Sequence, residues 1–83
     1  MYLLLNYKKY GNGEYHGRLE QSIRHGKGTF YFCDGSRYEG HWQKDMMDGK
    51  GILFCKDGSR YEGHWKKDMM DGKCTYFRSD GTK

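Results

Sequence analysis

Residues 38–42 alternate between aromatic, charged, small, polar and aromatic side chains. Successive side chains of an extended strand point to opposite faces, so Tyr38, Gly40 and Trp42 would share one face. A second run that favours extended structure follows at residues 51–55. The two runs together predict a pair of β-strands.

The segments that flank these runs are polar or turn-forming. Residues 43–50 are polar apart from Met46 and Met47, and we expect them to connect the two strands. Asp57 and Gly58 follow the second run and form a strong turn pair, because glycine accepts the positive φ that tight turns need. Each block is therefore predicted to be a β-hairpin that a turn joins to the next block.

The pattern recurs along the chain. Residues 34–50 return almost letter for letter as residues 57–73, with Lys66 in place of Gln43, and a more diverged copy lies upstream. A unit this short buries its apolar face only by stacking on its neighbours, and about three units is the usual minimum. The pattern predicts an all-β fold, an elongated single antiparallel sheet of successive β-hairpins. The three predicted units are residues 15–37, 38–60 and 61–83.

Large apolar side chains recur at three registers on one predicted face of this sheet. The glycines between the first two registers, Gly17, Gly40 and Gly63, leave room for a ring from an adjoining strand. We predict that this face is the core. Its members are Tyr15, Tyr38, Tyr61, Leu19, Trp42, Trp65, Phe30, Leu53 and Tyr76.

A second set of rings, Tyr31, Phe54 and Phe77, lies one residue away from the core register. Alternation should turn these rings to the opposite face. One interpretation is that twisting of the strands lets them cover part of that face. The other is an aromatic stripe that docks a partner, because contiguous exposed apolar patches usually mark interaction sites. These three residues are the candidate partner-binding residues.

The units share the order Tyr-x-Gly-x-Trp, Gly-x-Gly and Asp-Gly-x-x-Tyr, which resembles the MORN (membrane occupation and recognition nexus) repeat over residues 15–83. The resemblance implies a twisted antiparallel sheet of hairpins, as found in scaffolds, in cilia and in parts of some lipid-handling enzymes. Two positions depart from the pattern: Leu19 replaces the tryptophan of unit one, and Cys74 replaces a glycine of unit three. His25 of unit one matches a family histidine that is aspartate in the later units.

The first fourteen residues lie outside the repeats, and the third unit ends at Lys83. Residues 1–14 are predicted to be a capping strand and turn, with Leu3, Leu5 and Tyr7 covering the end of the stack. The alternative is a hydrophobic anchor for a membrane or partner. At the other end no cap follows Lys83, so self-association through an open edge strand, an added partner strand, and a chain cut from a longer repeat array all remain open.

Composition agrees with a sheet, since the chain has thirteen glycines, no proline and 17% aromatic residues. The net charge of +4 is spread over the units, so it predicts no nucleic-acid partner, which would need clustered basic residues. Binding to anionic lipid is a separate hypothesis, because five lysines gather near the hairpin connections, although aspartates lie among them. The candidate lipid-contact residues are Lys44, Lys50, Lys66, Lys67 and Lys73.

Candidate chemistry is sparse. Cys33, Cys55 and Cys74 have neither the paired spacing of a zinc site nor the even count of a disulfide framework, which favours a reduced, intracellular and cytoplasmic setting. His41 and His64 share a register, but no carboxylate or thiolate accompanies them at a fixed spacing. No nucleophile motif, phosphate-binding loop or catalytic carboxylate pair is present. We therefore expect no enzyme, cofactor or metal.

These observations predict a non-catalytic scaffold that mediates protein–protein interaction. The family resemblance adds a ciliary, axonemal or cytoskeletal assembly as the expected setting. The alternatives are peripheral binding to anionic phospholipid membranes, and a repeat segment of a larger lipid-signalling enzyme.

Overall fold

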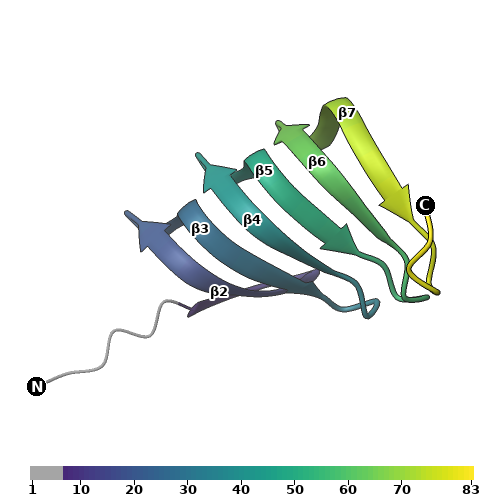
Figure 1. The fold of residues 1–83 in the computed structure, drawn as a ribbon. Coiled ribbons are helices and arrows are strands. Elements are labelled where there is room, and N and C mark those ends of the chain that lie inside the picture. Colours follow the sequence, from purple (N-terminus) through teal and green to yellow (C-terminus); the bar gives the residue numbers. More distant parts are fainter. Residues whose placement is uncertain (1–6) are drawn as a thin grey trace, which may run out of the picture.

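The computed structural model describes residues 7–83, and every regular element in them is a β-strand. The strands form one antiparallel sheet in which each strand pairs with its neighbours in the sequence (Figure 1). The sheet is elongated, with principal extents of 45 × 25 × 24 Å. This confirms the predicted all-β ribbon of successive hairpins. The strands are β1 (Tyr7–Tyr10), β2 (Gly13–Glu20), β3 (Ile23–Phe32), β4 (Arg37–Gln43), β5 (Met46–Phe54), β6 (Arg60–Lys66) and β7 (Met69–Phe77).

The described part of the N-terminal segment adds a strand to unit one. β1 pairs with β2, with Tyr7 opposite His16 and Tyr10 opposite Gly13. Only Gly11 and Asn12 separate the two strands, because β2 already begins at Gly13. Leu3 and Leu5, the other proposed members of the capping strand, lie outside the described residues.

The predicted connection over residues 43–50 is wrong. Only Lys44 and Asp45 separate β4 from β5, so Met46 and Met47 lie in a strand rather than in a loop. Both turn residues have positive φ, 49° and 71°. A two-residue turn of this kind matches the right-handed twist of the strands that it joins, and aspartate tolerates the left-handed region better than most residues. The turn carries no glycine, which is why the sequence pattern did not reveal it.

The core lies on one face of the sheet, which we call the inner face. Tyr15, Phe30 and Tyr38 are fully buried, and Trp42 and Trp65 nearly so. Each tyrosine contacts a tryptophan of the next unit edge to face: the ring centroids are 5.5 Å apart for Tyr15 and Trp42, and 5.4 Å apart for Tyr38 and Trp65. Stacking of neighbouring units therefore supplies burial that one hairpin could not, as the repeat pattern predicts.

A row of glycines crosses the sheet beneath the tyrosine rings. Gly40 lies opposite Gly28 and Gly51 on the neighbouring strands. A Cβ atom at Gly51 would lie only 2.1 Å from the hydroxyl oxygen of Tyr38. The missing side chain lets the Tyr38 ring lie across the backbone and donate a hydrogen bond of 3.2 Å to the carbonyl oxygen of His41.

Unit three departs from this packing at Cys74. Its Sγ lies 3.8 Å from the carbonyl oxygen of His64, which corresponds to the oxygen that Tyr38 bonds in unit two. Tyr61 instead packs against Tyr76, with ring centroids 4.8 Å apart. Tyr76, a predicted core residue, is 43% exposed. Replacing one glycine by cysteine therefore coincides with a looser core in the last unit.

Turn aspartates link each unit to the one before it. The Asp45 carboxylate accepts hydrogen bonds from the backbone N–H of Arg24, at 3.1 Å, and from its side-chain Nε, at 2.7 Å. Asp68, at the same register of the next unit, accepts a 2.8 Å hydrogen bond from the backbone N–H of Met47. The backbone N–H groups of both aspartates also donate to carbonyl oxygens of the preceding unit. These bonds fix the position of each hairpin end against its neighbour.

Candidate interaction surface

The opposite, outer face carries a row of five side chains in direct cross-strand register on β3 to β7. They alternate between aromatic rings and arginines, and we call them the aromatic–arginine row. The structure thus brings the three candidate partner-binding rings into one line. The Tyr31 side chain is 49% exposed, while the other two rings are half-buried. The row consists of Tyr31, Arg37, Phe54, Arg60 and Phe77.

The arginines of this row were missed from the sequence. The guanidinium carbon of Arg37 lies 3.9 Å from the ring centroid of Phe54, and that of Arg60 lies 4.0 Å from the centroid of Phe77. Stacking of this kind is attractive and covers part of each ring. The signal in the sequence was the recurrence of arginine just before Tyr38 and before its counterpart in unit three, but nothing in the pattern showed that it would meet a ring.

Each stacked arginine also holds a glutamate. Arg37 Nε donates to Glu39 Oε2 at 2.8 Å, and Arg60 Nε donates to Glu62 Oε2 at 2.6 Å. The four side chains are about a third to a half exposed, so each pair contributes little to stability. The pairs do, however, neutralise both glutamates.

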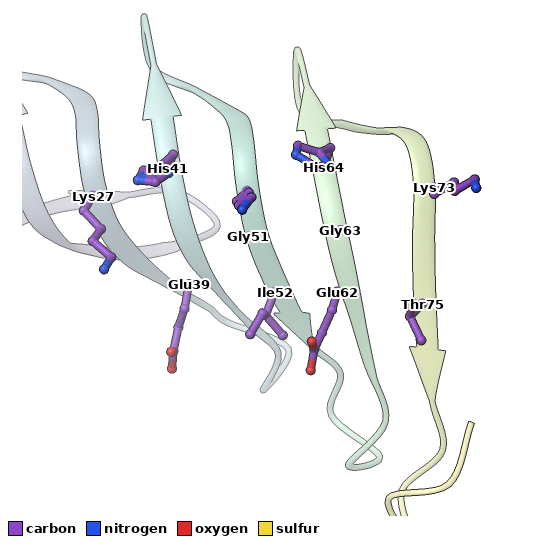
Figure 2. Close-up of a pocket in the computed structure, with 11 residues that line it drawn as sticks. Lys27, Glu39, His41, Gly51, Ile52, Glu62, Gly63, His64, Lys73 and Thr75 are labelled. Carbon is purple, nitrogen blue, oxygen red and sulfur yellow. The ribbon is translucent and has the colours of Figure 1, made fainter.

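A shallow channel crosses the outer face beside this row, and we call it the transverse channel (Figure 2). Its floor includes the backbone of the glycine row. One wall has lysines and histidines, and the other has polar, acidic and apolar side chains. The basic wall consists of Lys27, His41, Lys50, His64 and Lys73. The other wall consists of His16, Thr29, Glu39, Ile52, Glu62 and Thr75.

The five candidate lipid-contact lysines do not form one surface. Lys50 and Lys73 line the basic wall of the transverse channel. Lys44 and Lys67 are turn residues at equivalent hairpin ends, and Lys66 ends β6. The channel instead adds Lys27, which the sequence reasoning did not place among the candidates.

Two of the aspartates that lie among these lysines in the sequence, Asp45 and Asp68, accept hydrogen bonds from other groups. Burial acts to raise the pKa of Asp45, but hydrogen bonds from Arg24 and Tyr10 outweigh it and hold the pKa below its usual range. Asp34, Asp57 and Asp80 accept hydrogen bonds from Ser36, Ser59 and Thr82, and these bonds lower their pKa values. By contrast, the channel lysines are exposed and form no ion pair within residues 7–83.

Metal sites, membrane-spanning helices and cysteine chemistry were considered for the described part of the chain. Residues 7–83 contain no group of three or more histidine, cysteine, aspartate or glutamate side chains placed to hold a metal ion. None of their elements is a helix long and apolar enough to cross a membrane. Cys33, Cys55 and Cys74 are free thiols.

Comparison with protein families gives one result. The MORN repeat profile matches three consecutive segments, residues 15–37, 38–60 and 61–83. A comparison with curated proteins found no significant match. The family match indicates a repeat scaffold or binding module, in a family that is generally non-catalytic. The matched segments together cover most of the chain and coincide with the stacked hairpins of the sheet, so the protein belongs to the MORN repeat family.

Proposed function

We propose that the chain is a non-catalytic scaffold that binds another protein through its outer face. The observation that carries the proposal is the aromatic–arginine row, which presents alternating rings and guanidinium groups on five neighbouring strands. Aromatic residues and arginine are enriched at the centres of protein interfaces, where they contribute most of the binding energy. A paired sheet holds these side chains at fixed intervals, so little order needs to be gained on binding.

The setting that fits this role is intracellular. The family suggests a cytoplasmic scaffold, with a ciliary or cytoskeletal assembly as the place to look first for the partner. Neither the free thiols nor the charge pattern argues against such a setting.

A pull-down from cell extract, read by mass spectrometry, tests the proposal. The baits are the wild-type chain and a variant with Tyr31, Phe54 and Phe77 replaced by serine, both shown by circular dichroism to be folded. We expect the variant to lose specific partners that the wild type captures. The control replaces Ile23, Met69 and Met70 by serine, because these are also exposed apolar side chains but lie at the other ends of the strands. An identical partner set on all three baits would exclude the row as the docking surface.

Binding to anionic membranes is a second candidate, located at the hairpin ends. Lys66 lies directly opposite Met69, and Lys67 lies in the turn that joins their strands. Met69 and the following Met70 are 68% and 49% exposed. Basic and apolar side chains side by side suit contact with an anionic lipid surface. The test is co-sedimentation with phosphatidylcholine vesicles, with and without phosphatidylserine, at low and physiological salt. Failure to pellet with the anionic vesicles even at low salt would eliminate this candidate.

A further inference from the structure

The lysines of the transverse channel are regularly spaced. Lys27, Lys50 and Lys73 lie on β3, β5 and β7, with one strand between each pair. Because neighbouring strands lie about 4.8 Å apart, the lysines recur about every 10 Å along the channel. His41 lies directly opposite Lys27, and His64 directly opposite Lys50. The channel therefore offers cations at a constant interval in a line perpendicular to the strands.

The carboxylates that line the channel leave these cations available. Glu39 and Glu62 are held by Arg37 and Arg60 of the aromatic–arginine row. Figure 2 shows the side chains of Glu39 and Glu62 extending away from His41 and His64, toward the beginning of β4 and β6. A ligand in the channel therefore meets lysines that have no ion-pair partner within the described chain, and glutamates that already have one. Charge complementarity favours an anionic ligand.

The spacing selects the conformation of that ligand. A polyproline II helix has three residues per turn and advances about 9.3 Å per turn, so every third side chain points the same way at nearly the interval of the lysines. In a β-strand, side chains three residues apart point to opposite faces. An α-helix needs seven residues for about 10.5 Å, and its diameter of about 10 Å exceeds the roughly 7 Å between the two walls, which are two strand residues apart.

We propose that the transverse channel binds an acidic peptide segment in the polyproline II conformation, with a carboxylate at every third residue. This proposal rests on the protein-binding function proposed above and names the chemistry of the partner. The carboxylates pair with Lys27, Lys50 and Lys73, and the residues between them lie over the glycine backbone and against Ile52. A flat membrane surface meets the hairpin ends more readily than the floor of this recess.

The experiment uses the full chain and fluorescently labelled synthetic peptides, with binding followed by anisotropy at low salt. One peptide consists of repeated Glu-Pro-Pro triplets. A second has the same composition with its glutamates in one block, and a third replaces glutamate by lysine. We expect the periodic acidic peptide to bind at least about tenfold more tightly than the block peptide, and the lysine peptide not to bind. Equal affinity for the periodic and block peptides would overturn the spacing argument.

Two variants of equal charge locate the site. One replaces Lys27, Lys50 and Lys73 by glutamine, and the control replaces the hairpin-end residues Lys44, Lys66 and Lys67 by glutamine. The channel variant should bind the periodic peptide about tenfold more weakly, whereas the control should bind as the wild type does. Equal weakening in both variants would show nonspecific attraction to net charge and overturn the proposal.

The two proposals can fail separately. If the periodic peptide does not bind while the serine variant of the aromatic–arginine row still loses its cellular partners, the scaffold function stands and the acidic ligand is wrong. If phosphatidylserine vesicles pellet the wild type but not the channel variant, the channel is a lipid-headgroup site and the peptide proposal is overturned.

Discussion

At the scale of single residues, the fold depends on where side chains are missing. Tyr15 and Tyr38 can lie flat across the sheet only because Gly28 and Gly51 have no Cβ atom beneath the rings. Each hydroxyl then reaches a backbone carbonyl oxygen of its own strand, at 2.6 Å for Tyr15 and 3.2 Å for Tyr38. A buried hydroxyl without such a partner would be destabilising. Glycine and tyrosine therefore act as a pair, and each explains why the other recurs.

Replacing Gly51 by alanine should destabilise the protein by about 2 kcal/mol and lower the melting temperature by about 10 °C. The new Cβ would lie 2.1 Å from the Tyr38 hydroxyl oxygen, so a fully buried ring must move. Thermal and urea unfolding followed by circular dichroism measure the change. Gly11→Ala is the control, because a Cβ there has no neighbour within 4 Å. Equal stability of the two variants would refute the conclusion that Gly51 makes room for the Tyr38 ring.

Alkaline pH should destabilise the fold through the same tyrosines. Burial raises the pKa of Tyr15 to about 12 and that of Tyr38 to about 12. Above pH 10 the unfolded chain loses these protons while the folded chain keeps them, so the free energy of unfolding should fall as pH rises from about 10 to 12. Urea unfolding across this range would show the slope. Tyr38→Phe should make it shallower, and an unchanged slope would contradict the assignment.

At the scale of elements, the sequence pattern predicts the strands well and one class of turn badly. Alternation identifies the inner-face residues Tyr38 and Trp42 because a half-buried strand has a strict two-residue period. The Lys44-Asp45 turn is not predicted from the sequence, because it closes a hairpin without glycine and is held by contacts with another unit. The outer rings are predictable as a set for the same reason as the core. The stacking of these rings with arginine could not be predicted, because it depends on cross-strand register. The transverse channel could not be predicted for the same reason.

Asp45→Asn should lower the free energy of unfolding by about 1.5–3 kcal/mol, because Arg24 loses a charged hydrogen-bond partner in a largely buried position. Asp68→Asn is the matched control: asparagine tolerates the left-handed turn conformation and can still accept the bond from the Met47 N–H.

Acid provides a second readout for the same pair of variants. The pKa of Asp45 is lowered in the folded state, so the stability that its charge contributes is present above about pH 4 and disappears as pH falls through the folded pKa. The difference between the two variants in urea unfolding should therefore shrink as the pH is lowered. Equal losses for both variants at neutral pH would show that the Arg24 ion pair contributes nothing measurable.

At the scale of the whole molecule, the two faces of the sheet carry different sets of side chains. Its inner face is filled by rings that pack between neighbouring units, whereas its outer face carries regularly spaced rings, arginines and lysines. The same stacking that buries the core therefore also sets the interval of the outer groups. Any partner that uses more than one unit must match that interval of two strands, about 10 Å.

Inserting a second copy of residues 38–60 after Arg60 should lengthen and stabilise the protein. The copy contributes two strands, so the longest dimension from small-angle X-ray scattering should grow by about 10 Å. The copy also adds a buried tyrosine ring that lies over a glycine rather than over a cysteine such as Cys74. Because it adds a new interface between units as well, the free energy of unfolding should rise. The control inserts a scrambled sequence of the same length, which should form a loop and raise neither quantity. If the true copy lengthens the chain without raising its stability, then contacts between units contribute no net stabilisation, and the explanation of the fold by stacking would have to be abandoned.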